Sequence, residues 1–142
     1  MDQTLNSNLG VRQALDPAAY AAEAAVGNWI GMTGFRRCMF AINLGATTGA
    51  VAVKVQEATD DQGTGAQDIT GLSGSLAATD DGKLAIIEVR DVDVSEGFTH
   101  VALVVTPAAA STYLAATALL GEPYSAPVSN EPADGVVFNV GE

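Results

Sequence analysis

The chain has 142 residues, close to the usual size of one domain, and 48% of them are apolar while only 16% are charged. Such a composition excludes a disordered chain and allows a single buried core. The formal net charge of −11, with six lysines and arginines in all, would repel phosphate groups, so nucleic acids and anionic membrane surfaces are excluded as expected partners.

Residues 1–28 are expected to form an N-terminal arm. The stretch "MDQTLNSNLG" is polar and lacks the basic start and apolar run of a secretory signal, and no part of the chain has the ~20 apolar residues of a membrane span. The next stretch, "LDPAAYAAEAAVG", is rich in alanine, and Asp16 followed by Pro17 fits the first turn of a helix. Its apolar side chains are mostly methyl groups, which would anchor a helix weakly. The sequence therefore leaves a short helix and an extended arm as alternatives.

Two strands are predicted after Trp29. The stretch "CMFAINL" at residues 38–44 is apolar, and residues 51–55 alternate valines with Ala and Lys, which is the period of a half-buried strand. The turn-forming residues "GATTG" at positions 45–49 lie between them, so the two strands are predicted to pair as a hairpin.

The polar stretch "DDQGTGAQD" at residues 60–68 is predicted to be the tip of a hairpin, because Asp bonds its own backbone in turns and Gly accepts a positive φ. A calcium loop of the EF-hand type needs alternating oxygen ligands and a glutamate at its twelfth position. Here Asp60 and Asp61 are adjacent, and the twelfth position is Gly71. A solvated turn is therefore preferred to a metal site.

Three further strands are predicted. Residues 84–89 alternate, and the side that carries Ala85 is the more uniformly apolar. Residues 99–106 are almost continuously apolar, as in a strand covered on both faces. The run "TYLAATALLG" at residues 112–121 is short, contains threonine and tyrosine, and follows a strand, so a strand is preferred to a helix.

Short strands separated by turns predict an all-β fold class: an antiparallel β-sandwich, jelly-roll-like, with extended N- and C-terminal arms. The expected divisions are the arm over residues 1–28, a β-sandwich domain over residues 29–122, and a Pro-containing C-terminal tail over residues 123–142. Proline resists helix interiors and central strands, so the tail is expected to lie extended on a surface.

The tail contributes most of the expected partner-binding residues. Tyr124 is expected to anchor the tail in a pocket of a neighbouring subunit. The stretch "GVVFNV" at residues 135–140, with Val136, Val137 and Phe138, is expected to add a strand to an exposed sheet edge of this chain or of a neighbour.

Arg36 and Arg37 form the one compact basic spot in an acidic chain. One interpretation is a salt-bridge patch for an acidic partner or another subunit, which adds both arginines to the expected partner-binding residues. The other interpretation is a pair of exposed charges that flank an apolar strand and discourage aggregation.

No pattern predicts chemistry. Cys38 is the single cysteine, so no internal disulfide or Cys-x-x-Cys metal spacing is possible, and it is expected to be a buried hydrophobe. The single histidine, His100, lies in a predicted strand and is expected to be structural or exposed, and not a general base. The sequence contains no nucleophile elbow, zinc-protease pair or phosphate loop. We therefore expect no catalytic residues, no metal, no cofactor and no enzymatic activity.

The segments "NWIGMTGFRRCMFAINLGATTGAVAVKVQEATDDQGTGAQDITG", "DGKLAIIEVRDV" and "FTHVALVVTPAAASTYLAATALLGEPYSAPV" together resemble a group of small proteins of tailed bacteriophages and prophages. The resemblance covers residues ~26–128 and depends on the order of alternating strands and turn residues. Two features depart from the group: "GFTHVALVV" stands where a basic strand start is usual, and the tail after Pro127 is particular to this chain.

This resemblance implies a virion structural protein, made in the host cytoplasm, that acts as a capsid decoration or cement protein. Its implied partners are the major capsid protein or other virion proteins and further copies of itself, as a trimer or dimer, with no nucleic acid and no membrane. The alternatives are a tail or head-fibre-base structural protein, and a receptor- or carbohydrate-binding β-sandwich module.

Overall fold

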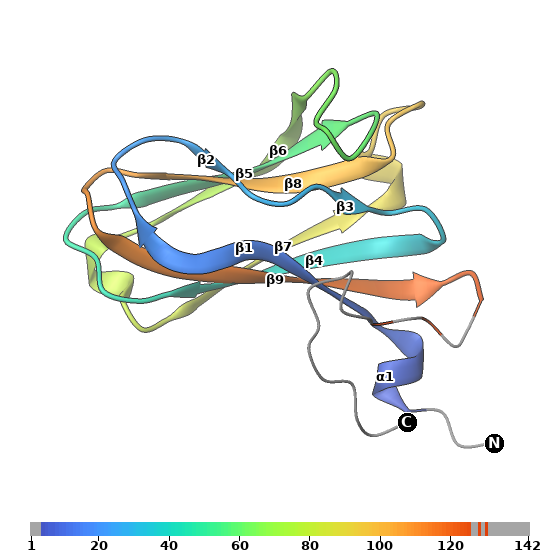
Figure 1. Cartoon of the computed structure of the whole chain (residues 1–142), viewed down its shortest axis with the longest axis horizontal. Coiled ribbons are helices and arrows are strands. Elements are labelled where there is room, and N and C mark those ends of the chain that lie inside the picture. The colour runs from blue at the N-terminus through green and yellow to red at the C-terminus, as the bar shows by residue number, and fades with distance from the viewer. Residues whose placement is uncertain (1–3, 126–127, 129, 131–142) are drawn as a thin grey trace.

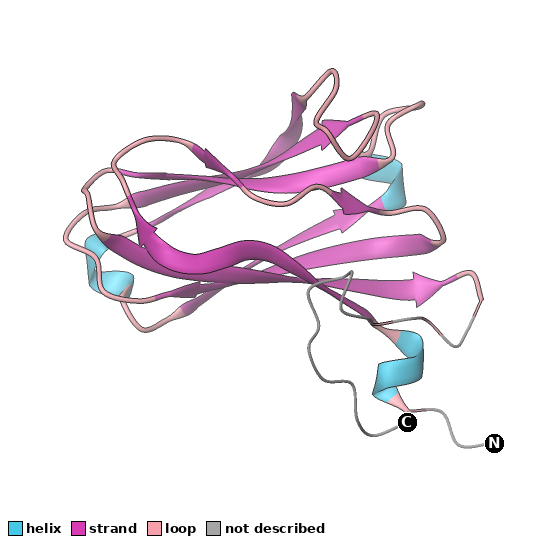
Figure 2. Ribbon diagram, in the orientation of Figure 1, coloured by secondary structure: helices cyan, strands magenta, loops and turns pink. Residues whose placement is uncertain are grey.

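Strands make up most of the part of the chain that the computed structural model describes, which is residues 4–125, 128 and 130 (Figure 2). The helical elements are single turns: α1 (Leu5–Asn8), η1 (Ala78–Asp80) and η2 (Asp91–Asp93). The strands are β1 (Gly10–Tyr20), β2 (Ala25–Val26), β3 (Ile30–Gly31), β4 (Phe35–Leu44), β5 (Val51–Ala58), β6 (Gln67–Leu76), β7 (Leu84–Arg90), β8 (His100–Pro107) and β9 (Thr112–Pro123). None of the described helices is long and apolar enough to cross a membrane.

The strands form two antiparallel sheets that pack face to face (Figure 1). Sheet A has the order β1-β9-β4-β7, and sheet B has the order β2-β8-β5-β6, with β3 also paired to β8. When β2 and β3 are counted as one interrupted strand, the first strand pairs with the last, the second with the second-last, and so on inward. This nested pairing is that of a jelly roll. The predicted all-β sandwich is therefore confirmed.

The core lies between the sheets and is built from the side chains that alternate inward along each strand. Val51, Val53 and Val55 are at most 4% exposed, as their alternation predicts, and β7 turns its Ala85 side inward. The largest side chains that are fully buried in this layer are Phe40, Ile42, Leu103 and Leu120. Burial of this apolar set is the main favourable contribution to the stability of the fold.

The N-terminal region differs from the expected arm, because residues 10–20 form β1, which pairs with β9 at one edge of sheet A. Ala14 and Leu15 are buried there, so pairing and burial outweigh the helix preference of an alanine-rich stretch. Register shifts follow Gln13 and Leu15, and these bulges interrupt the alternation that would have revealed a strand. The sandwich therefore begins at Gly10 and not at Trp29.

The predicted hairpin of residues 38–44 with residues 51–55 is wrong, because the first segment lies in sheet A and the second in sheet B. Strand β4 pairs with β7 and β9, whereas β5 pairs with β6 and β8. The connection between them crosses from one sheet to the other, and Gly45 N–H bonds the Tyr113 carbonyl of β9 instead of β5. Alternation identifies strands but carries no information about their partners.

Candidate functional site

The buried polar side chains of the described residues are bonded within the fold, and none lacks a hydrogen-bond partner. Glu57, at the end of β5, is 2% exposed. Its carboxylate accepts hydrogen bonds from Gln67 Nε2 (2.7 Å), from the Ser95 N–H (2.7 Å) and from Ser95 Oγ (2.6 Å). Burial raises the pKa of Glu57, but the bonds from Ser95 and Gln67 outweigh burial and hold the pKa below its ordinary value. This carboxylate joins β5 to β6 and to the loop before β8.

The acidic stretch at residues 60–68 forms the tip between β5 and β6, as predicted. Asp60 accepts bonds from the N–H groups of Gln62 and Thr64 (both 3.0 Å) and from the Thr64 hydroxyl (2.6 Å). These bonds, chiefly the one from the Thr64 hydroxyl, lower the pKa of Asp60. Within the described ranges, no cluster of three or more His, Cys, Asp or Glu side chains is placed to hold a metal ion.

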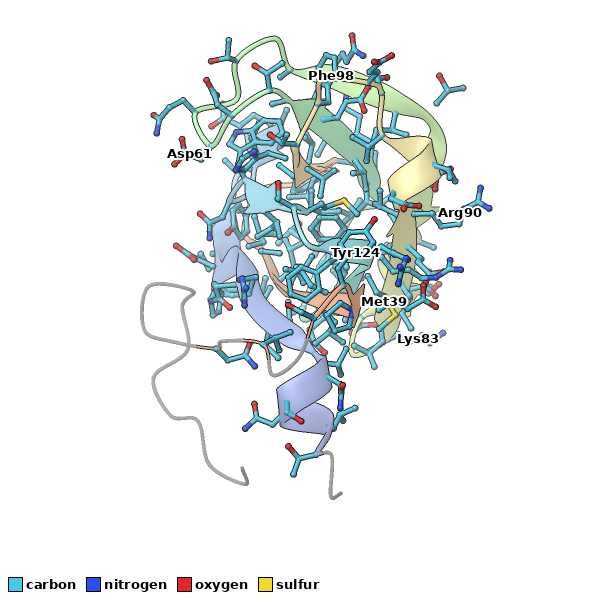
Figure 3. The ribbon with its side chains drawn as sticks, turned by 90° about the vertical axis from the view of Figure 1, so that its right-hand side faces the viewer. Met39, Asp61, Lys83, Arg90, Phe98 and Tyr124 are labelled. Carbon is cyan, nitrogen blue, oxygen red and sulfur yellow. The ribbon has the colours of Figure 1, made fainter. Side chains whose placement is uncertain are left out.

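Arg36 and Tyr124, two of the predicted partner-binding residues, are in contact. Figure 3 shows Tyr124 at the end of the sandwich that faces the viewer. The Arg36 guanidinium stacks 4.4 Å from the centre of the Tyr124 ring, an attractive cation–π geometry. The Tyr124 N–H bonds the Gly34 carbonyl at 2.9 Å, and its ring remains 59% exposed. Beside it is a hollow of about 280 Å³, whose lining includes Asp91 and Phe98. This end presents an aromatic ring and a cation together.

Arg37, the neighbour of Arg36 in β4, points to the outer face of sheet A. Its guanidinium lies 3.3 Å from the Glu122 carboxylate and 3.7 Å from that of Glu88. The two adjacent arginines therefore serve different surfaces, as expected for consecutive residues of a strand. Arg37 balances charge on sheet A, and Arg36 remains with Tyr124.

The outer face of sheet A is apolar to a degree that the sequence analysis missed. Leu84 and Ile86 of β7 are 63% and 60% exposed, and Tyr113 of β9 is 52% exposed. The register places Ile86 beside Ala41 and Ala41 beside Thr117, so small and apolar side chains continue across the strands. In residues 84–89 the inward side is the more uniformly apolar, but the outward side also carries two large apolar residues, Leu84 and Ile86.

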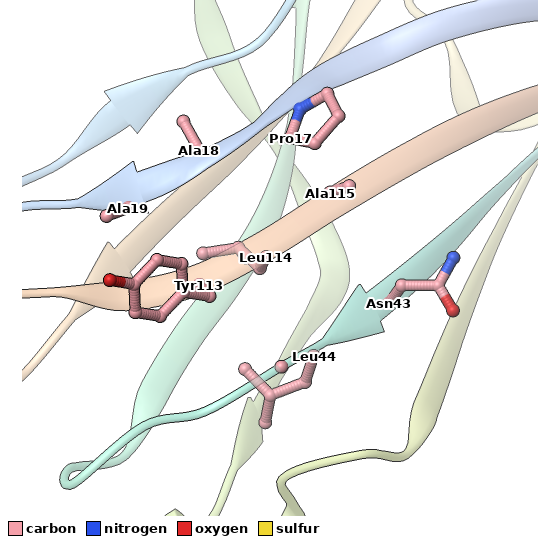
Figure 4. Close-up of a pocket in the computed structure, with 9 residues that line it drawn as sticks. Pro17, Ala18, Ala19, Asn43, Leu44, Tyr113, Leu114 and Ala115 are labelled. Carbon is pink, nitrogen blue, oxygen red and sulfur yellow. The ribbon is translucent and has the colours of Figure 1, made fainter.

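A groove of about 510 Å³ lies at one end of this outer face, where β1, β4 and β9 meet (Figure 4). It is lined by Pro17 and alanines of β1, by the ends of β4 and β9, and by Tyr113. Its walls offer methyl groups and an aromatic ring, and its polar side-chain groups are the Asn43 amide and the Tyr113 hydroxyl. This composition suits an apolar partner segment.

Asn130 is a further residue that the sequence analysis missed. It is 5% exposed and accepts a bond from the Val11 N–H at 2.6 Å, while its amide nitrogen donates to the Leu9 carbonyl at 2.9 Å. It therefore fixes the tail to the start of β1. No local sequence pattern distinguishes Asn130 from the other asparagines of the chain. Val136, Val137 and Phe138 lie outside the described residues.

No family model matches the chain. No curated protein matches its sequence. Among solved structures, a chain from Bacillus endospore appendages, described as disulfide-linked pili, is similar at 16% identity and a TM-score of 0.48, covering 87% of this chain and 97% of its own. The SPBc2 prophage-derived protein YomS is similar at 8% identity and a TM-score of 0.48, covering 86% of this chain and 99% of its own. A chain of the IBDV viral particle is similar at 12% identity and a TM-score of 0.42, covering 86% of this chain and 33% of its own. At these values the likeness carries no argument about function.

Proposed function

We propose that this chain is a non-enzymatic structural protein of a phage virion, a decoration or cement protein that binds the assembled head. The observation that carries the proposal is the end of the sandwich where Tyr124, 59% exposed, stacks on the Arg36 guanidinium in a chain of net charge −11. An exposed aromatic ring beside an arginine suits a contact with another subunit, because aromatic residues and arginine are enriched at protein interfaces.

The resemblance of residues ~26–128 to small tailed-phage proteins supports the virion role. The jelly-roll topology is compatible with it, since this architecture occurs in viral capsid domains, but it also occurs in lectin domains and does not decide function. The polar groups described above favour a structural role over catalysis. Glu57 and Asp60 use their carboxylate oxygens to hold the fold and one loop.

Decoration would act by burying apolar surface at a junction between capsid subunits, worth roughly 25 cal/mol per Å² before the costs of association. Each contact can be weak when many copies bind one shell. We place the attachment surface at the end of the sandwich that holds Arg36 and Tyr124. The exposed ring there provides apolar area, and the guanidinium provides a charge for an acidic partner.

The proposal is tested on purified virions from cells that encode the chain. Quantitative mass spectrometry of separated heads and tails should find the chain on heads, in a fixed ratio to the major capsid protein. Its presence on tails alone would favour the tail-protein alternative, and its absence from particles would refute a virion role.

The attachment surface is tested by rebinding the purified chain to heads stripped of it. The Arg36→Ala and Tyr124→Ala variants should be released at lower salt than the unmodified chain, whereas Lys54→Ala should behave normally. Lys54 is a suitable control because it pairs with Asp68 on sheet B, away from this end. Equal retention of all three variants at every salt concentration would exclude this surface.

A further inference from the structure

Strand β7 is the edge of sheet A that no described element covers. Sheet edges expose unpaired N–H and C=O groups, which natural proteins usually protect with bulges, prolines, short strands or covering segments. The opposite edge, β1, has two bulges and Pro17, and Asn130 caps its Val11 N–H. In sheet B, β2 and β3 have two residues each, and β6 is interrupted by a register shift opposite Lys54. By contrast, β7 pairs with β4 in an unbroken register over its whole length.

The backbone groups that remain open on β7 can be assigned from the ladder. Residues of an antiparallel strand bond alternately to one side and the other. The Lys83 carbonyl faces β4, where it accepts from the Leu44 N–H, so the odd-numbered residues bond β4 and the even-numbered ones point outward. The Arg90 N–H is already bonded to Asp93 at 2.9 Å. The open segment is therefore Leu84 to Glu88, with Ile86 at its centre.

We propose that β7 pairs antiparallel with β7 of a second copy of this chain, across a two-fold axis at Ile86. In this register Ile86 faces its own counterpart, and Leu84 of each copy faces Glu88 of the other. These are the residues whose backbone groups point outward, so the open groups of both copies are satisfied together. Two sheets A become one continuous sheet, as in strand-addition complexes.

The side chains suit this register. Ile86, 60% exposed, faces its own counterpart in an apolar cross-strand pair, and Leu84, 63% exposed, lies diagonally beside Ile86 of the other copy. Glu88 adds little repulsion, because Arg37 lies 3.7 Å from its carboxylate. Arg90 of one copy comes opposite Gly82 of the other, beside the acidic Asp80-Asp81 turn. The contact is therefore apolar at its centre and complementary in charge at its ends, although each copy carries a net charge of −11.

Lys83 and Arg90 mark the two ends of this segment and point away from the body of the sandwich (Figure 3). The α1 turn and the tail residues Val128 and Asn130 lie instead beside β1 and β9, across the width of the sheet, and Tyr124 lies past the end of β7, near Asp91. A second copy can therefore approach β7 without displacing them.

The register is tested by paired cysteine substitutions in the full chain, oxidised with glutathione disulfide. Ile86→Cys should give a disulfide-linked dimer, because facing residues on the axis have Cα atoms about 5.5 Å apart, within the range that a disulfide spans. Leu84→Cys should not, because the two copies of residue 84 would lie roughly 13 Å apart along the ladder. Cys38 does not interfere, since it is fully buried and burial raises its pKa to about 12. Cross-linking of Leu84→Cys but not of Ile86→Cys would overturn the register.

The pairing itself is tested by sedimentation velocity and light scattering of the purified chain. The unmodified chain should be a dimer. Ile86→Pro should raise the dimer dissociation constant by about 100-fold or more, because it removes an outward N–H without costing a bond to β4. Ile86→Thr, which keeps the N–H and suits a strand, should raise it by less than about 10-fold. Unchanged circular dichroism spectra would show that both variants are folded.

Other outcomes overturn the proposal. A monomer at all accessible concentrations would do so, as would an unchanged dimer in Ile86→Pro. The alternative partner for the edge of β7 is the C-terminal tail of the same chain. A monomer that becomes a dimer only when Val137→Asp and Phe138→Asp are combined would assign the edge to that tail. None of these measurements uses virions, so the proposed function and this inference can fail separately.

Discussion

Glu57 is the one charged side chain that the described part of the fold buries almost completely. A buried carboxylate is costly unless its oxygens accept hydrogen bonds, and Ser95 and Gln67 supply them. The same bonds connect β5 to β6 and to the loop before β8, so Glu57 stabilises the packing of these three segments. Because its pKa is lowered in the folded chain, its stabilisation is complete above the ordinary carboxyl pKa of about 4.3 and is lost as pH falls through the lower folded-state value.

Replacement Glu57→Gln should therefore lower the free energy of unfolding at pH 7 by about 1–3 kcal/mol, since an amide NH₂ would face the Ser95 donors. It should also flatten the loss of stability between about pH 5 and the acid limit of the folded state. Urea unfolding at a series of pH values measures both effects. Glu96→Gln, at an exposed position beside Ser95, is the matched control and should change little. Parallel pH profiles for Glu57→Gln and the unmodified chain would contradict this account.

Strand β1 is held to sheet B by the short segment that follows it. The Gly27 N–H bonds the Leu103 carbonyl of β8, and the Asn28 N–H bonds the Ala14 carbonyl of β1, both at 2.8 Å. This close approach leaves no space for a side chain at residue 27, where a Cβ atom would overlap the Ala14 carbonyl oxygen. Gly27 thus allows the segment after β1 to join β1 to β8 at one edge of the sandwich. The other edge strand of sheet A, β7, has no such connection to a described segment.

Replacement Gly27→Ala should destabilise the chain by about 2–4 kcal/mol, because the overlap is with backbone that cannot turn aside. Gly74→Ala is the matched control, since neither glycine has a positive φ and a Cβ at residue 74 would have Val53 Cγ2 as its nearest neighbour at 3.9 Å. That variant should stay within about 1 kcal/mol of the unmodified chain. Thermal unfolding of the two variants compares them directly, and equal midpoints would refute the packing argument.

The whole molecule combines a strongly acidic charge with an apolar face and an open edge on one sheet. Like charge keeps separate copies apart, while the face and the edge favour association. The balance between these effects depends on ionic strength, because salt screens exposed charges over a Debye length of about 10 Å at 0.1 M.

Dimerisation through β7 should therefore become stronger as salt rises from about 20 to 500 mM, with a several-fold fall in the dissociation constant. Sedimentation equilibrium over a salt series measures this dependence. A dimer that weakens with salt would instead be held by ion pairs. The opposite trend is expected for attachment through Arg36, so the two contacts are distinguishable in one buffer series.

The sequence alone determined the strands β4, β5, β7, β8 and β9 and which way most of them face, but not β1 or β6. Alternation is a local property, so the valines of residues 51–55 and the Ala85 side of residues 84–89 turn inward as predicted. The hairpin tip at residues 60–68 also follows from local chemistry, because Asp60 bonds its own loop. Bulges remove the alternation in β1, so its local sequence does not predict a strand.

Only the tertiary structure decided which strands pair and which edge stays open. Pairing of β4 with β7 and β9 brings together residues far apart in the chain, and many such pairings satisfy the same alternation. It was also the folded chain that brought Arg36 to Tyr124 and Asn130 to Val11. These contacts depend on which segments the packed sheets leave side by side, a property that no local stretch of sequence contains.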